Sequence, residues 1–235
     1  MSTLAARVQV YGIVPAAGSS RRMGRPKPSL PYGDSTMVGI LVRTLLNADL
    51  DGVVVVTRSE LAASLDLPRD PRIVIVYNDD ANSEMIDSVR AGLMHLVIAE
   101  RLKRRNAETQ KRRNARMNDR FLFSAFPRFC VSGRVGVLIV PADMPAIRVE
   151  TYRACLAAFA VDPESLVIAA NGGRRGHPII FPWSLGADVM GLHNGLRELA
   201  QIHADRVRLV ETGDPGVTRD VDSPDDYQRL RSAER

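Results

Sequence analysis

The residues best suited to phosphate chemistry lie in one short loop near the start of the chain. The segment 14–27 reads VPAAGSSRRMGRPK and follows an apolar run of strand length. Ala16, Ala17 and Gly18 carry almost no side chain, so their backbone N–H groups can approach phosphate oxygens closely. Four cations follow within seven residues, namely Arg21, Arg22, Arg25 and Lys27. This density of positive charge predicts an anion-binding loop, and the alternative is a solvated basic turn.

Two common phosphate-binding motifs do not fit this loop. The dinucleotide fingerprint G-x-G-x-x-G fails because five residues separate Gly18 from Gly24. The P-loop pattern fails because Arg25 and Pro26 follow Gly24, where that motif requires Lys and then Ser or Thr. The loop therefore indicates a different class of phosphate-binding protein.

A carboxylate and a histidine are further candidates for chemistry. Asp143 follows the apolar run 135–140, and a carboxylate at the carboxyl end of a strand can hold Mg²⁺ together with phosphate oxygens and water. The alternative for Asp143 is a turn residue or a helix N-cap. His177 precedes Pro178 at the start of a predicted strand, where a lone histidine can equally be a packed or surface residue.

Apolar patterns predict the elements that position these residues. Continuous apolar runs are typical of parallel strands covered by helices on both faces, and they occur at 8–14, 53–57, 73–77, 135–140 and 166–170. Apolar residues at helical spacing predict helices at 36–48, 83–99 and 149–160. This alternation predicts an α/β fold with a mainly parallel central sheet flanked by helices.

The C-terminal part contains more turns. A turn at 171–175 leads into a predicted strand at 178–181, followed by a helix at 194–203 and a strand at 206–211. The sequence Ser-Pro-Asp-Asp at 223–226 has the N-cap, the proline and the acids that begin a helix, so we expect a final helix over 224–231.

Residues 100–134 interrupt this pattern. The stretch 100–120 has nine Lys or Arg and three acids, a net charge of +6, so the rest of the +5 chain has a net charge of −1. We therefore expect a single domain over 1–235 with a basic insertion at about 100–134, either a helical extension or a disordered loop. A solvated segment, a partner-docking surface and a nucleic-acid site are its alternatives. Nucleic acid is disfavoured because no aromatic residue lies among the cations of 101–116.

Composition limits the class of protein. Hydrophobic residues make up 45% of the chain and charged residues 25%, as in ordinary globular domains. Two cysteines, Cys130 and Cys155, exclude a disulfide scaffold and fit a reducing compartment. No apolar run reaches the roughly 20 residues of a membrane span, and the first residues lack the apolar core of a signal peptide. We expect a cytoplasmic protein without a membrane partner.

The loop AAGSSRRMGRPK resembles the signature A-A-G-x-S-x-R-M-G-x-x-K of nucleotidyltransferases with a Rossmann-like sheet. Within that fold the chain is most similar to the MobA-like family, and especially to molybdenum cofactor cytidylyltransferases. Further matching segments are LPYGD at 30–34, NDD at 78–80, SVRAGL at 88–93, PADMP at 141–145, GRRGHP at 173–178 and DVDSPDDY at 220–227. Only 100–134 falls outside the resemblance.

The resemblance implies a role for each matching residue. Arg22, Lys27 and Asp143 would be catalytic, and Asp143 would hold Mg²⁺ with help from Asp222. The nucleotide would contact Ala16, Ala17, Gly18, Arg22, Lys27, Asn78 and Ser88. The segment Gly176, His177 and Pro178 would bind the acceptor. For Asp222 the alternative is a carboxylate that simply favours the start of a helix.

The implied reaction transfers a nucleoside monophosphate from a nucleoside triphosphate to a molybdopterin-type phosphate and releases pyrophosphate. Ala-Ala-Gly in the signature favours CTP, whereas Ala-Gly-Gly goes with GTP. Two positions depart from the family: Pro15 lacks an N–H beside the loop, and Glu84 stands where a glycine usually precedes Met85. Transfer to another small phosphate, such as a sugar phosphate, and a non-catalytic molybdenum cofactor carrier are the alternatives. A client molybdoenzyme is a further expected partner.

Overall fold

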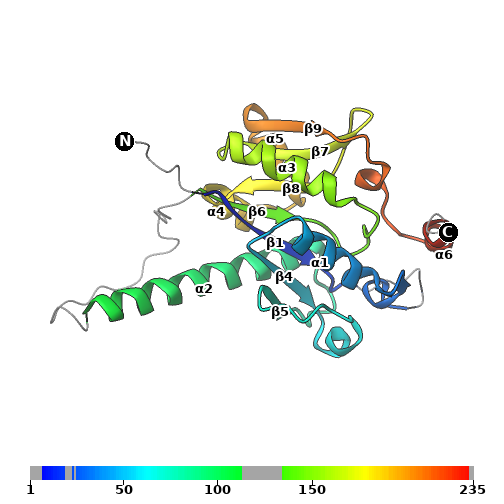
Figure 1. Ribbon diagram of the computed structural model, residues 1–235, viewed down its shortest axis with the longest axis horizontal. Helices are drawn as coiled ribbons and strands as arrows, with labels where there is room; N and C mark the ends of the chain where they lie inside the picture. Colours follow the sequence, from blue (N-terminus) through cyan, green and yellow to red (C-terminus); the bar gives the residue numbers. More distant parts are fainter. Residues whose placement is uncertain (1–6, 19–22, 24, 113–133, 233–235) are drawn as a thin grey trace.

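A seven-stranded sheet forms the centre of the computed structural model, which describes residues 7–18, 23, 25–112 and 134–232 (Figure 1). Its strands are β1 (Gln9–Pro15), β4 (Gly52–Thr57), β5 (Ile73–Tyr77), β6 (Val135–Ile139), β7 (Leu166–Asn171), β8 (Arg174–Pro182) and β9 (Val207–Glu211). The order across the sheet is β5-β4-β1-β6-β8-β7-β9. Only β8 runs antiparallel to its neighbours, so the predicted mainly parallel sheet is confirmed.

Helices cover both faces of this sheet (Figure 1). They are α1 (Met37–Asn47), α2 (Met85–Arg112), α3 (Val149–Val161), α4 (Gly186–Gly191), α5 (Leu196–Ile202) and α6 (Pro224–Ser232). Short 3-10 helices are η1 (Lys27–Ser29), η2 (Ser59–Ser64), η3 (Trp183–Leu185), η4 (Ala204–Arg206) and η5 (Pro215–Thr218), and a small hairpin joins β2 (Pro31–Tyr32) to β3 (Ser35–Thr36). Helices α1 and α3 pack on one face, and α2, α4 and α5 pack on the other.

Alternating side chains of the central strands supply the two halves of the core. Val14 of β1 packs with the α1 and α3 side chains, whereas its neighbour Ile13 packs with the side chains of α2 and α4. Both are fully buried. Burial on both faces explains why the inner strands contain no polar alternation. The predicted Rossmann-like α/β class is therefore confirmed.

Helix α2 is longer than the pattern at 83–99 predicts. It continues to Arg112, so a helical extension is correct for the first part of the basic segment, while 113–133 lie outside the described residues. In the described part of the chain, no helix combines the length and the apolar character needed to cross a membrane. Helix α4 was not predicted, because its six residues GADVMG are too few to show helical periodicity.

Strand β5 differs from the prediction that it is buried on both faces. It forms one edge of the sheet, and the side chains of Ile75 and Tyr77 are 36% and 58% exposed. Val76, which points to the opposite face, packs with the α2 side of the core. A continuous apolar run therefore marked a strand correctly but did not distinguish an edge strand from an inner one.

The turn predicted at 171–175 is narrower in the structure. Asn171 pairs with Arg174, so strand β8 begins four residues earlier than expected. Gly172 and Gly173 form the turn with φ values of 58° and 74°, a conformation that other residues adopt only with strain. The hairpin places the segment 176–178 within β8, just before the residues 179–182 that pair with β6.

Replacing Tyr152 with phenylalanine is expected to stabilise the protein. Tyr152 of α3 is fully buried, and among the described residues its hydroxyl has no hydrogen-bond partner. Because a buried unpaired hydroxyl is costly, we expect the free energy of unfolding to rise by about 1 kcal/mol in urea denaturation. Phe159→Tyr, which adds a hydroxyl at a buried site on the same helix, is the matched control and should have the opposite sign. A less stable Tyr152→Phe would contradict this prediction.

Candidate functional site

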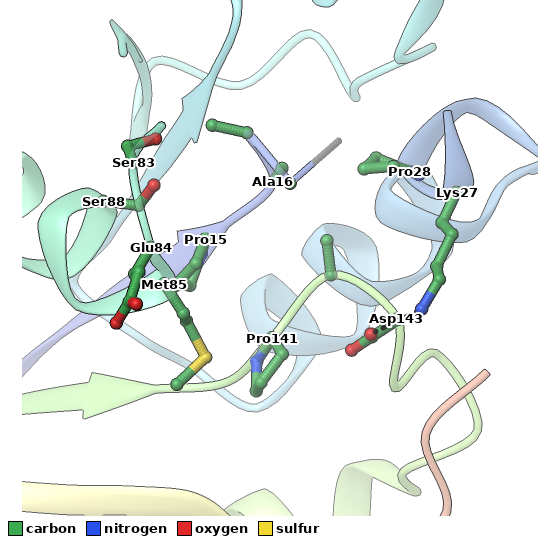
Figure 2. A pocket seen from close by; sticks show the side chains of 13 residues that line it. Pro15, Ala16, Lys27, Pro28, Ser83, Glu84, Met85, Ser88, Pro141 and Asp143 are labelled. Carbon is green, nitrogen blue, oxygen red and sulfur yellow. Dashed lines mark hydrogen bonds and ion pairs between the residues drawn. The ribbon is translucent and has the colours of Figure 1, made fainter. Parts of the chain in front are cut away.

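A cavity of about 200 Å³ lies at the carboxyl ends of β1 and β6, beside the start of α2 (Figure 2). Four segments that are distant in sequence form its walls. The lining residues are Pro15, Ala16, Ala17, Gly18, Lys27, Pro28, Ser83, Glu84, Met85, Ser88, Pro141, Ala142 and Asp143. The cavity therefore contains the small-residue loop and the acidic candidate that the sequence singled out separately.

Hydrogen bonds to both neighbouring strands fix the end of β1. The Ala16 N–H donates to the Val56 carbonyl at 2.7 Å, and the Ala142 N–H donates to the Pro15 carbonyl at 3.1 Å. This corrects the expectation that all three small residues offer N–H groups to phosphate, because the N–H of Ala16 belongs to the sheet. In the described part of the chain, the N–H groups of Ala17 and Gly18 have no acceptor.

Arg58 is a residue of the site that the sequence analysis missed. It follows β4 directly, and its Nε donates to the Ala17 carbonyl at 3.1 Å. Its side chain is 21% exposed and also lies 3.7 Å from a carboxylate oxygen of Glu60. Arg58 thus holds the backbone of the small-residue loop from the side opposite to β6. A single arginine after a strand belongs to no recognised motif, so no signal marked it.

Lys27 is held between two carboxylates at the edge of the cavity. Its Nζ lies 2.6 Å from Oδ1 of Asp222 and 3.4 Å from Oδ2 of Asp143. The Lys27 side chain is 14% exposed and that of Asp143 is 26% exposed. Figure 2 shows the Lys27 ammonium directed at Asp143. Asp143 and Asp222, which are 79 positions apart in sequence, therefore both pair with the largely buried Lys27 ammonium.

The environment of Asp143 disfavours its charged form. Burial raises the pKa of Asp143 above its ordinary value, and the nearby carboxylates of Asp220 and Asp222 act in the same direction, while Lys27 opposes them. Asp143 occupies a turn, and the N-cap of the following helix α3 is Arg148, so the helix-cap alternative for Asp143 is wrong. A carboxylate whose charged form is destabilised by burial, and which lies beside a cation, is typical of a functional site.

Asp222 reaches the site through the start of α6. The Val221 N–H donates to the Asp143 carbonyl at 3.0 Å, which ties this stretch to the loop after β6. The bonds at the start of the helix are accepted by Asp226, whose carboxylate receives the Ser223 hydroxyl at 2.6 Å and the Ser223 N–H at 2.9 Å. The Ser223 hydroxyl is the main reason why the pKa of Asp226 falls to about 2. The Asp222 carboxylate itself pairs with Lys27.

Ser88, which is hydrogen-bonded to Asn78, forms part of the cavity wall on the α2 side. Asn78 follows β5, and its Nδ2 donates to the Ser88 hydroxyl at 3.3 Å. Ser88 lies on the first turns of α2 and lines the cavity, whereas Asn78 stands behind it. Ser83, Glu84 and Met85 also line this side, although the resemblance assigned them no role. Arg22 lies outside the described residues.

The predicted acceptor segment lies beside the cavity and does not line it. The register pairs Ile179 with Ile139, so the residues 176–178 run past the end of β6, next to the loop that carries Asp143. Pro178 is buried after a cis peptide bond, and the His177 Nδ1 lies 3.3 Å from the Ile139 carbonyl. Gly176 packs against the backbone of Val217. Close packing thus accounts for the glycine at 176 and the buried proline at 178 without an acceptor.

Acid is expected to destabilise the protein through His177. Burial is the main cause that lowers the pKa of His177 to about 4, from an ordinary value of 6.5. The unfolded chain therefore binds a proton between these values while the folded one does not. Stability should be complete above pH 6.5 and should fall by on the order of 1–3 kcal/mol as the pH drops to 4. His177→Asn should flatten that part of a urea-denaturation pH profile. An unchanged profile would contradict the prediction.

Two carboxylates beside the cavity, those of Asp143 and Asp222, are the candidate metal ligands. In the described ranges there is no group of three or more His, Cys, Asp or Glu residues that could hold a metal ion. Asp143 and Asp222 are the carboxylates beside the cavity that already bind a cation, the Lys27 ammonium. A Mg²⁺ ion commonly uses one or two carboxylates together with substrate phosphates and water, so this pair fits such an ion.

The chain is similar in sequence and fold to several known proteins. The chain is 29% identical over 229 residues to the purine catabolism protein PucB of Bacillus subtilis (strain 168), covering 95% of this chain and 97% of PucB. Its fold is similar to that of Rv0371C from Mycobacterium tuberculosis H37Rv, solved as a complex with manganese, with a TM-score of 0.63, 23% identity, and coverage of 96% and 99%. It is also similar to 4-diphosphocytidyl-2C-methyl-D-erythritol synthase from Anaerococcus prevotii DSM 20548, with a TM-score of 0.64, 14% identity, and coverage of 96% and 98%.

The family match covers most of the chain. Residues 12–209 match the MobA-like NTP transferase domain, a range that begins within β1 and includes the small-residue loop, Lys27 and Asp143. Asp222 lies beyond the matched range and enters the site through α6. With the fold, the loop and the acidic residue after β6 all in the expected places, the chain belongs to the MobA-like NTP transferase family.

Proposed function

We propose that this nucleotidyltransferase moves CMP from CTP to a molybdopterin-type phosphate, with Mg²⁺ as the metal and with release of pyrophosphate. The observation that carries the proposal is the Lys27 ammonium bound by Asp143 and Asp222 at a cavity that Ala17 and Gly18 also line. These residues provide cationic, metal-binding and N–H groups in one place. Both reactants are anions, so the site has to neutralise charge and align them.

Each residue has a distinct task in the proposed reaction. The N–H groups of Ala17 and Gly18 bind phosphate oxygens, and Arg58 keeps that loop in position through the Ala17 carbonyl. Lys27 stabilises the negative charge that develops on the triphosphate as pyrophosphate leaves. Asp143 and Asp222 hold the metal, which supplies further charge neutralisation when bound. Ser88, supported by Asn78, contacts the nucleoside.

Support for CTP and for the acceptor comes from different features. The Ala16-Ala17-Gly18 sequence favours cytosine by resemblance, and one similar fold belongs to a protein named for a diphosphocytidyl product. For the acceptor, the GRRGHP sequence favours a molybdopterin by resemblance, and its segment 176–178 lies beside the loop that carries Asp143. A divalent metal agrees with the manganese in a similar fold.

A nucleotide panel tests the proposal. Full-length protein is heated with CTP, GTP, ATP or UTP, each with Mg²⁺ or EDTA, and pyrophosphate release is then measured with a molybdopterin acceptor. We expect the largest Mg²⁺-dependent rise in melting temperature with CTP, because a ligand of the native state stabilises it by mass action. Ala17→Gly should weaken the preference for CTP over GTP. Preference for another nucleotide would overturn the CTP assignment, and binding without pyrophosphate release would favour a carrier.

The basic segment is proposed to be an insertion in a single domain that the reaction does not need. Helix α2 extends away from the sheet as it enters this segment (Figure 1). Deleting residues 101–120 is expected to leave nucleotide turnover within about twofold of the wild-type value, because none of the cavity-lining residues belongs to it. Loss of turnover with an intact melting transition would mean that the insertion contributes to the site.

A further inference from the structure

The two ion pairs of Lys27 place its ammonium where a metal ion would contact the carboxylates of Asp143 and Asp222. Oδ1 of Asp222 and Oδ2 of Asp143 are the atoms that face the ammonium. A Mg²⁺ ion needs carboxylate oxygens at about 2.0–2.1 Å. An ammonium 2.6 Å from one of these oxygens occupies the space and neutralises the charge that would attract such an ion.

We infer that Lys27 acts as the resident cation of this site and keeps divalent metals out until a nucleoside triphosphate draws its ammonium away. The inference rests on the proposed function, since it concerns the same metal and the same triphosphate. Without a cation, the carboxylate of Asp143, which is 26% exposed, would be poorly hydrated and would be repelled by that of Asp222, which is 49% exposed. Lys27 removes that cost in the nucleotide-free protein.

The surroundings allow the Lys27 side chain to move while its backbone remains fixed. Lys27 begins η1, where its carbonyl accepts the Leu30 N–H at 3.0 Å, and the next residue, Pro28, is buried. Leu30 is itself packed in a small apolar cluster with Met37 and Val221. The long side chain of a lysine carries a point charge that can be redirected without backbone change.

The cavity offers the Lys27 ammonium a second position, beside a bound triphosphate. Lys27 and Asp143 both line it, and so do Ala17 and Gly18, whose N–H groups are suited to phosphate. A triphosphate bound there would offer oxygens to the ammonium, and a divalent cation could then approach the carboxylate oxygens that the ammonium had faced. Lys27 therefore makes metal binding depend on the nucleotide, in addition to stabilising the reaction.

Manganese binding to nucleotide-free protein tests the inference. Bound Mn²⁺ is measured by electron paramagnetic resonance on the full chain, without any nucleotide. Wild-type protein is expected to bind Mn²⁺ weakly, and Lys27→Met, which keeps the length of the side chain without its charge, should bind it at least roughly tenfold more tightly. Lys27→Arg should bind it as weakly as wild type.

Two further variants locate the effect. Arg72→Gln removes an equal charge from an exposed pair with Asp70 that precedes β5, at the opposite edge of the sheet, and should not change Mn²⁺ affinity. The double variant Lys27→Met, Asp143→Asn should lose the gained affinity. If Lys27→Met binds Mn²⁺ no better than wild type, or if the gain survives in the double variant, the inference is wrong. Lys27→Gln provides the same test if Lys27→Met does not fold.

These outcomes are independent of the transfer reaction. A wild-type protein that transfers CMP while Lys27→Met gains no Mn²⁺ affinity would overturn only the role of Lys27 as resident cation. A protein that releases no pyrophosphate with any nucleotide, but whose Lys27→Met variant gains Mn²⁺ affinity through Asp143, would overturn the proposed function and leave the cation exchange established.

Discussion

Replacing Asp143 with asparagine is expected to reduce nucleotidyl transfer by at least about a thousandfold, because the reaction loses a charged metal ligand and a partner of Lys27. The fold should survive, since asparagine has the same shape and the Val221 N–H binds the backbone carbonyl of this residue. The rate is measured as pyrophosphate released from CTP. Asp34→Asn, which removes a carboxylate from an exposed pair with Arg43, is the control and should remain fully active.

The same Asp143→Asn variant is expected to be more stable than wild type. Burial raises the pKa of Asp143 above the 3.8 of the unfolded chain, so the ionised carboxylate costs stability once the pH is above both values. The cost is absent below the unfolded value and grows as the pH rises through the folded one. The stability difference from wild type should therefore be larger at pH 7.5 than at pH 4 in urea denaturation. A variant that is less stable at pH 7.5 would show that the attraction of Lys27 outweighs the burial.

Replacing Gly176 with alanine is expected to destabilise the protein by about 3 kcal/mol or more. A Cβ at this position would lie 1.9 Å from the Val217 carbonyl oxygen and 2.7 Å from its carbonyl carbon. These are backbone atoms of η5, which Asp214 caps and whose Gly216 in turn approaches the Ala146 carbonyl closely. The clash cannot be relieved by a rotamer change, so either β8 or η5 has to move.

Unfolding in urea and the melting temperature measure this effect. Gly186→Ala is the matched control, because Gly186 has helical dihedral angles of −58° and −34° and a Cβ there meets nothing within 4 Å. That control should be neutral or slightly stabilising. If Gly176→Ala keeps wild-type stability but loses transfer only with the molybdopterin acceptor, the residue serves the acceptor and not the packing.

The strands could be predicted because a continuous apolar run suits a strand that helices cover on both faces. The run 73–77 matches β5 in both bounds, yet its position at the sheet edge depends on which strand pairs with which, and a local pattern carries no such information. Helix α4 is too short for periodicity, and strand β8 was shortened in the prediction because Arg174 and Arg175 resemble a solvated turn.

The candidate site was predictable where a residue type has a fixed place relative to a strand. Asp143 and the small-residue loop each follow a parallel strand, so strand geometry brings them to the same edge of the sheet, whereas Lys27 reaches that edge through η1. Arg58 was missed, because its bond to the Ala17 carbonyl exists only after two strands have paired. The hydrogen bond from the Ala16 N–H to the Val56 carbonyl was missed for the same reason, because it too forms only when β1 and β4 pair.

Under the metal-binding role proposed for Asp222, the last segment of the chain to be synthesised completes the site. Tyr227 of α6 donates its hydroxyl to the Pro31 carbonyl at 2.6 Å, so the end of the chain is anchored beside a segment made almost two hundred residues earlier. A nascent chain that ends before residue 222 can pair every strand of the large sheet and still lack half of its acidic pair. Under that proposed role, chains that end before Asp222 would not transfer nucleotide, and activity would begin only when synthesis is nearly finished.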